Sequence, residues 1–381
     1  MPNRIVHLVD SFDPACRPVV LRMIARLARD NRDEHRAILF GPANDAEACG
    51  LPVARHFDFR PGLGPRTWRA LRRDLQRRGP DEIIHCWSAR MLLVATVIAR
   101  HTPRLLNVFG PVDATWPTGR LRRALHRSPA TLLAGNGSIA DDLRRAGMPA
   151  RRLHVSPPGV EPDPDAVRRR AILREQWGVD EQTLLVAHLA DPPERCDALM
   201  GMWAAGLVIE SGRPLKLLLP SEARHRRRVF DLVERSRRDM LVVSEAIRRP
   251  WEALAACDAA MALACGKPRA AEDAPPGPGP DATAGPGLLH AMAAGLPVIA
   301  ERDTAAGAWL THERDALLGR TSVPREQARH LCRLIDEPGL ADRLGQAARE
   351  RAATCFGADR RLTAMHAVYD QLATGERVRT P

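Results

Sequence analysis

Two glycines flank a proline immediately before a short apolar helix, and this stretch has the clearest potential for chemistry. The first amides of a helix have no partner inside it and carry partial positive charge, while glycines let a bulky anion approach the backbone. The pattern therefore predicts a phosphate or diphosphate site, unless it is only a tight loop that leads into a core helix. The candidate binding residues are Gly285, Pro286, Gly287, Leu288, Leu289 and His290.

Further side chains have types and positions suited to anion binding or proton transfer. Arg195 is a candidate phosphate ligand in a stretch that follows a predicted strand. His85 and Asp113 lie near the ends of predicted strands, where α/β sheets bind ligands, and they are the candidate catalytic residues. Asp10 lies in a similar place. Simpler interpretations stay open: a polar strand end for His85, solvated loops for the aspartates, and a backbone hydrogen bond for His290.

Strands that alternate with helices are expected to position these residues. Such alternation predicts an α/β fold with parallel sheets covered on both faces. Gly295 is expected to end the helix after Gly287 in the left-handed conformation, and a strand follows from Pro297. Residues 266–284, rich in Pro, Gly and acid, are predicted to be a mobile surface loop. The other predicted strands are residues 5–9, 37–40, 82–86, 105–108, 131–134, 153–156, 184–189, 215–219, 241–243 and 258–263.

Length and composition limit the class of protein. A chain of 381 residues exceeds one ordinary core, and 45% hydrophobic with 27% charged residues is a globular composition. We expect an N-terminal domain at 1–162, a C-terminal domain at 163–358, and a C-terminal helix with a frayed tail at 359–381 that returns to the N-terminal domain. The eight cysteines contain no C-x-x-C pair, and no signal peptide or membrane-spanning run is present, which favours the cytoplasm.

The net charge of +11 raises nucleic acid and anionic membranes as partners. Only Lys216 and Lys267 are lysines, and aromatic residues, at 4%, are not interleaved with the arginines as a base-stacking surface requires. Nucleic acid is therefore not expected. Basic helices at 69–78 and 119–125 are compatible with peripheral contact on the inner face of an anionic membrane, although a solvated charged face is the commoner explanation.

Several segments together resemble the GT-B glycosyltransferases of the family-4 type. The most specific match is residues 290–300, His-Ala-Met-Ala-Ala-Gly-Leu-Pro-Val-Ile-Ala, and the other matching segments are residues 4–11, 136–143, 155–160 and 256–261. The resemblance implies two Rossmann-like domains whose parallel sheets face a central cleft. It also implies transfer of a sugar from a nucleotide-diphosphate sugar to an acceptor hydroxyl on a glycan or lipid, with retention at the anomeric carbon. Members of the family need no metal or other cofactor.

The chain departs from the family pattern where that pattern carries charge. The two glutamates of the donor loop correspond to Ala282 and His290, and the diphosphate-binding Arg and Lys to Leu189 and Glu194, with Arg195 adjacent. The histidine near the reacting centre corresponds to Phe109. Losing both cations removes several kcal/mol of diphosphate binding, and a helix terminus returns only about 0.3–2 kcal/mol. The alternative hypothesis is a catalytically degenerate relative that acts as a binding or scaffolding module.

Overall fold

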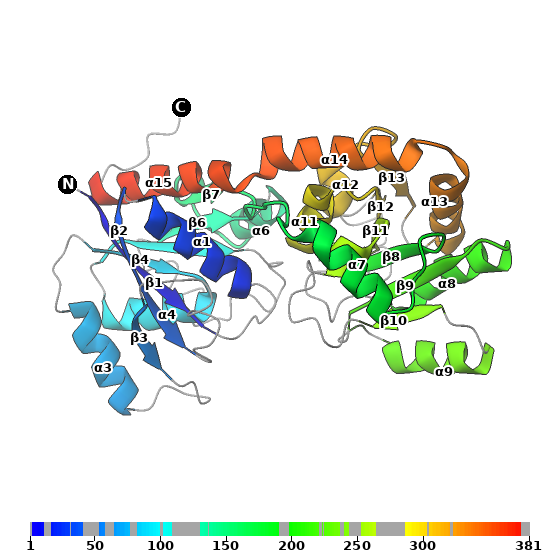
Figure 1. Cartoon of the computed structure of the whole chain (residues 1–381). Coiled ribbons are helices and arrows are strands. Elements are labelled where there is room, and N and C mark those ends of the chain that lie inside the picture. Colours follow the sequence, from blue (N-terminus) through cyan, green and yellow to red (C-terminus); the bar gives the residue numbers. More distant parts are fainter. Residues whose placement is uncertain are drawn as a thin grey trace. The chain divides into compact units, whose positions relative to one another are not determined.

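The computed structural model divides the chain into two compact units (Figure 1). Unit 1 comprises residues 1–159 and 358–381, and unit 2 comprises residues 160–357, so the chain leaves unit 1 once and returns to it once. The loop predicted at 266–284 lies outside the described residues. The structure describes residues 2–10, 17–30, 32–40, 53–57, 65–76, 82–99, 102–108, 130–135, 137–189, 198–220, 223, 225–236, 240–243, 253–263, 286–302, 305–320 and 323–374.

Unit 1 is built on a seven-stranded sheet in which every described pairing is parallel. The strands are β1 (Arg4–Val9), β2 (Glu34–Phe40), β3 (Val53–Phe57), β4 (Glu82–Cys86), β5 (Arg104–Val108), β6 (Thr131–Ala134) and β7 (Leu153–Val155). Their order across the sheet is β3-β2-β1-β4-β5-β6-β7. The near-continuous apolar runs in β1, β2 and β4 are typical of strands covered on both faces.

Helices cover both faces of this sheet. The helices are α1 (Arg17–Arg29), α3 (Pro65–Gln76), α4 (Ala89–Ile98), α6 (Gly137–Arg145) and α15 (Ala358–Thr374), with a short 3-10 turn at Ala150–Arg152. On one face α3, α4 and α6 pack over Val6, Ile38 and Ile84. On the other face α1 and α15 pack over Ile5 and Ile83. The last described helix of the chain therefore completes the core of the first unit (Figure 1).

Unit 2 repeats this architecture with a six-stranded parallel sheet. The strands are β8 (Leu184–Leu189), β9 (Leu215–Leu219), β10 (Leu241–Val243), β11 (Ala259–Ala262), β12 (Val298–Glu301) and β13 (Ala316–Gly319), in the order β10-β9-β8-β11-β12-β13. The helices are α7 (Ala166–Gln176), α8 (Ala198–Glu210), α9 (Arg226–Ser236), α11 (Pro286–Ala294), α12 (Ala305–Trp309), α13 (Pro324–Asp336) and α14 (Leu340–Phe356). One apolar layer contains α8, α9 and α13, and the other contains α11, α12 and α14. A short 3-10 turn at Leu254–Ala256 precedes β11.

Each sheet has a point where the strand order reverses. In unit 1, β1 lies between β2 and β4, and in unit 2, β8 lies between β9 and β11. The two connections that leave such a point pass to opposite faces of the sheet, which leaves a crevice outside the carboxyl ends of the two central strands. The topology therefore directs the search for a ligand site to the carboxyl ends of β1 and β4 and of β8 and β11.

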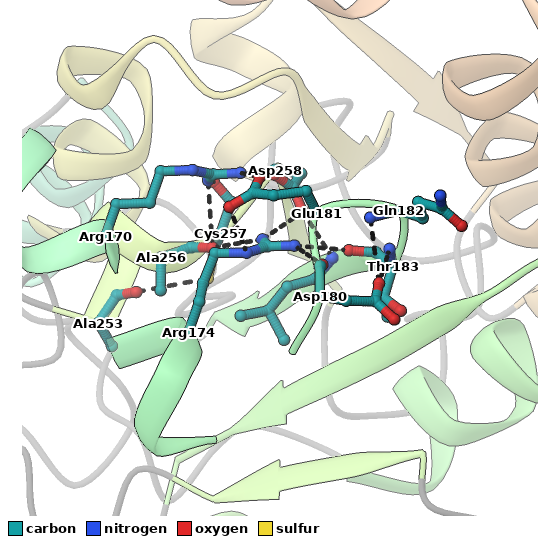
Figure 2. A network of polar contacts seen from close by, with 11 residues as sticks. Arg170, Arg174, Asp180, Glu181, Gln182, Thr183, Ala253, Ala256, Cys257 and Asp258 are labelled. Atoms are coloured by element: carbon teal, nitrogen blue, oxygen red, sulfur yellow. Dashed lines mark hydrogen bonds and ion pairs between the residues drawn. The ribbon is translucent and has the colours of Figure 1, made fainter. Parts of the chain in front are cut away.

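A polar network braces the opposite, amino edge of the sheet in unit 2 (Figure 2). Arg174 of α7 is buried and donates to Asp258 (Nη1–Oδ2, 2.9 Å), to the Ala256 carbonyl (3.0 Å) and to the Thr183 carbonyl (2.9 Å). Asp258 also accepts from Arg170 (2.7 Å) and from the backbone N–H of Leu185 at the start of β8 (2.8 Å). One carboxylate thus fixes α7 against both strands of the reversal point, β8 and β11.

Candidate functional site

The amino terminus of α11 lies at the carboxyl edge of the unit 2 sheet. Because β11 and β12 are parallel neighbours, the chain must return from the carboxyl edge to the amino edge of the sheet between them, and α11 leads into β12. α11 therefore begins at the carboxyl edge of the sheet, where the strand order reverses between β8 and β11. The first turn contains no acidic side chain, so nothing within the helix opposes an anion there.

The ends of α11 follow from its sequence. Gly295 has φ 76° and ends the helix: its N–H donates to the Met292 carbonyl (2.9 Å), and the Leu296 N–H donates to the Ala291 carbonyl (3.1 Å). This is a Schellman motif, and it confirms the predicted left-handed cap. Arg349 of α14 donates to the Ala294 carbonyl (2.7 Å), which places a cation at the negative end of the helix. The opposite, positive end remains at the carboxyl edge of the sheet.

The residues predicted to bind the anion differ in how accessible they are to a ligand. Leu288 and Leu289 are fully buried in the core under α11, so they can offer a ligand only their backbone amides. Gly287 and His290 are partly exposed. Pro286 is the first residue of α11, whereas Gly285 and Arg195 lie outside the described residues. The binding roles of all seven stay predictions.

In unit 1, Asp10 and Ser88 lie at the corresponding carboxyl ends of β1 and β4. Asp10 follows β1 and is 7% exposed, and Ser88 precedes α4. The Ser88 hydroxyl donates to Asp10 Oδ2 (2.6 Å) and accepts from the Met91 N–H (3.2 Å), so the serine caps α4 and holds the carboxylate at its amino end. Sequence reasoning identified Asp10 but missed Ser88, although a serine directly before an apolar helix is a recognisable capping signal.

His85 has a different environment from the one predicted for a catalytic residue. It is fully buried, its Nδ1 contacts the Tyr369 hydroxyl of α15 (2.6 Å), and its Nε2 contacts the Asn107 amide. Its ring stacks on Trp87 at 4.3 Å between centroids. Both ring nitrogens are thus engaged inside unit 1, and the catalytic role of His85 stays a prediction. Asp113, the other catalytic candidate, lies outside the described residues, as does Phe109.

Arg361 and Trp87 can only donate hydrogen bonds, and they therefore fix the tautomers of the buried histidine rings around His85. Arg361 donates to Asn107 Oδ1, so the Asn107 amide donates to His85 Nε2, and neutral His85 carries its hydrogen on Nδ1. Trp87 Nε1–H donates to His7 Nδ1 (3.1 Å), so His7 Nε2–H donates to Nδ1 of His35 (3.0 Å). Burial lowers the pKa of both His7 and His85 well below the ordinary value, which keeps the rings neutral.

The described part of the chain bears on three further features, namely metal sites, membrane-spanning helices and reactive thiols. There, no group of three or more His, Cys, Asp or Glu side chains is arranged to hold a metal ion. Within the same residues, no helix combines the length and apolarity needed to cross a bilayer. Cys86 and Cys257 are free and buried, and burial raises the pKa of both thiols above the ordinary value.

Comparison with known proteins agrees with this architecture. Residues 18–164 match the family model described as Glycosyltransferase Family 4. No curated protein sequence matches the chain. Among solved structures, Anabaena HepE in complex with UDP and glucose has a TM-score of 0.73 at 17% identity, over 97% of this chain and 99% of that one. The glycosyltransferase WaaG has a TM-score of 0.61 at 15% identity, over 98% and 100%.

A third neighbour is the sucrose-phosphate synthase of Thermosynechococcus elongatus, with a TM-score of 0.69 at 16% identity, over 98% of this chain and 100% of that one. These structures extend over both units, and both sheets have the expected parallel, helix-covered form. The chain therefore has the GT-B fold, as the sequence predicted. At such low identity the likeness establishes the fold alone.

Proposed function

We propose that this GT-B chain is a glycosyltransferase that moves a sugar from a nucleotide-diphosphate donor to an acceptor hydroxyl on a glycan or lipid, with retention at the anomeric carbon. The observation that carries the proposal is the amino terminus of α11 at the reversal point of the unit 2 sheet. Backbone amides and the helix dipole there can stabilise the negative charge that develops on a departing diphosphate. The match of residues 18–164 to a glycosyltransferase family and the UDP complexes of HepE support it.

UDP is the nucleotide we favour, because HepE was crystallised with UDP and with UDP-glucose. Gly285, Pro286, Gly287, Leu288 and Leu289 would supply the backbone of the diphosphate site, with His290 and Arg195 as the polar side chains. The proposal includes no bound metal, so we expect activity to persist after treatment with EDTA. It places the protein in the cytoplasm, with peripheral membrane contact as an addition that the exposed arginine face of α3 permits.

The second candidate function is a degenerate, non-catalytic binding module. One observation favours it: Leu189, which stands where the family has a diphosphate-binding cation, is a buried strand residue with no charge. Calorimetry with UDP and GDP separates the two hypotheses when it is combined with hydrolysis of a panel of nucleotide sugars. Binding together with turnover supports the transferase, and the anomeric configuration of the product then tests retention. Binding without turnover favours the degenerate module, and the absence of both overturns the proposal.

A charge substitution tests the α11 site directly. Gly287→Asp and Gly287→Asn add side chains of nearly equal size, but only aspartate places a negative charge in the first helical turn. Aspartate there favours the helix by about 0.3–1 kcal/mol and repels a diphosphate. We therefore expect UDP to bind Gly287→Asp at least about tenfold more weakly than Gly287→Asn, with folding intact in both. Equal UDP affinities would show that the diphosphate does not bind at this helix, and His290→Ala and Arg195→Ala would then test the side-chain contributions.

A further inference from the structure

Helix α8 of unit 2 is apolar around its whole circumference, although one side of it faces solvent. Its sequence, Ala-Leu-Met-Gly-Met-Trp-Ala-Ala-Gly-Leu-Val-Ile-Glu, has no charged residue before Glu210. Ala198, Ala204, Ala205 and Val208 lie on the buried side, in the core over β8 and β9. A helix that is apolar on every side is normally covered on every side. We therefore expect a binding partner to cover the outer side of α8.

The outward stripe of α8 is made of large apolar side chains. Trp203 is 58% exposed and Leu207, one turn later, is 45% exposed. Met200 precedes them on the same side and is partly exposed. Isolated exposed apolar residues are ordinary on protein surfaces, but consecutive ones along a single helix face form a patch. α9 and α13 share this layer and extend it on either side of α8.

Helix α9, which contacts α8, carries further exposed apolar side chains and positive charge. Phe230 and Leu232 are each 40% exposed, and the Arg226 guanidinium lies over the Phe230 ring at 5.9 Å. Arg227 and Arg228 are exposed at the amino end of the helix. Arginine stems and aromatic rings together suit a boundary between water and an apolar phase.

The charges on α9 and α13, beside the exposed apolar stripe of α8, indicate the kind of partner. On α13, Glu326 pairs with Arg320 (2.6 Å) and Asp336 with Arg213 (2.5 Å), so these carboxylates are already neutralised within the chain. The exposed arginines around this surface form no ion pair within the described residues. They outnumber the exposed acidic residues nearby, which are Asp231 and Glu234 of α9 and Glu210, one turn after Leu207 on α8. These arginines are Arg227, Arg228, Arg235, Arg325 and Arg329.

We propose that the outer surface of α8 and α9, centred on Trp203 and Leu207 and bordered by Arg227 and Arg228, docks on an anionic lipid bilayer. The apolar stripe enters the boundary between headgroups and acyl chains, and the arginines contact lipid phosphates. A second copy of the chain is a poorer occupant, because pairing two such surfaces brings arginine rims together. This surface is distinct from the arginine face of α3, which belongs to unit 1 and has charge without an exposed apolar stripe.

Co-sedimentation of the full chain with phosphatidylcholine vesicles, with and without phosphatidylglycerol, tests the proposal. We expect binding only to the anionic vesicles. Trp203→Ala/Leu207→Ala should lower the apparent partition coefficient at least about tenfold, because the apolar contact is lost. Arg227→Gln/Arg228→Gln should lower it by a similar factor at low salt and have less effect at high salt. Val167→Ala, which trims an 88% exposed valine on α7, is the matched control and should bind like the wild type.

Three results would overturn the proposal. The first is no binding to anionic vesicles at low salt. The second is binding that the α8 and α9 variants leave unchanged, which would assign membrane contact to another surface such as α3. The third is a dimer, measured by light scattering, that Trp203→Ala/Leu207→Ala converts to a monomer, because a second copy would then cover the stripe. An unchanged circular dichroism spectrum and thermal midpoint show that each variant is folded.

Discussion

Acid should destabilise unit 1 through the buried histidines between its sheet and α15. His35 of β2 is 7% exposed, and its pKa falls from 6.5 to about 4, chiefly because burial disfavours the charged ring. The charged and titratable groups around it are His7 of β1, His366 and Tyr369 of α15, and Asp30 and Asp33, which precede β2. The two aspartates oppose the shift, and His366 adds to it.

The direction of the pH effect follows from proton binding. Above pH 6.5 neither the folded nor the unfolded state protonates His35, so its full contribution to stability is present. As the pH falls from 6.5 toward 4, His35 binds a proton in the unfolded chain but not in the folded chain. The free energy of unfolding therefore decreases. The difference between 6.5 and about 4 corresponds to about 3 kcal/mol. His7 and His85, whose pKa values are also lowered, add losses of the same sign.

Urea unfolding followed by circular dichroism at a series of pH values between 7.5 and 4 measures this loss. His35→Asn removes the titrating ring and keeps an acceptor for His7 Nε2–H. We expect its unfolding free energy to fall by about 3 kcal/mol less than that of the wild type over this range. Leu75→Ala, a core truncation in the same unit, costs about 2–5 kcal/mol at every pH and should keep the wild-type slope. Identical slopes for His35→Asn and the wild type would refute the reasoning.

Two further predictions concern unit 2. Asp258→Ala should lower the free energy of unfolding by about 3–5 kcal/mol, because the buried Arg174 guanidinium then keeps only the exposed Glu181 carboxylate, at 3.7 Å. Glu181→Gln, at a 77% exposed side chain of the same network, should cost less than about 1 kcal/mol, and equal losses in the two urea titrations would contradict this account. Gly345→Ala should cost about 1–3 kcal/mol, because its Cβ would lie 2.1 Å from the Gly295 carbonyl oxygen where α14 crosses the end of α11. An unchanged thermal midpoint would show that the two helices separate freely.

Much of the fold was predictable because parallel strands buried on both faces leave a strong local signal. The apolar runs of β1, β4 and β8 are bounded by polar residues and stand out in the sequence. The strands β3 and β13 and the helix α7 were missed. β13 is a four-residue strand, Ala-Leu-Leu-Gly, that carries no β-branched or aromatic residue and ends in glycine. α7 has charged residues around most of its surface, and its arginines bind the sheet edge through long-range contacts.

The candidate site was predictable to the extent that it depends on local chain geometry. The left-handed Gly295 and the helix before it follow from nearby residues, and both have the predicted form. The environment of His85 does not follow from its neighbours in sequence. Tyr369, which contacts it, lies 284 positions later on α15, and no pattern around a strand end reveals a helix that returns from so far along the chain.

The return of α15 to unit 1 affects how the chain folds while it is synthesised on the ribosome. When residue 159 leaves the exit tunnel, Ile5 and Ile83 still lack Met365 and Tyr369, which later join their core. The contiguous segment 160–357 can fold while translation continues. The sheet of unit 1, which is synthesised first, keeps one apolar face partly exposed until α15 emerges. A premature stop codon before residue 358 would thus harm the earliest part of the polypeptide, and chaperones would meet that face first.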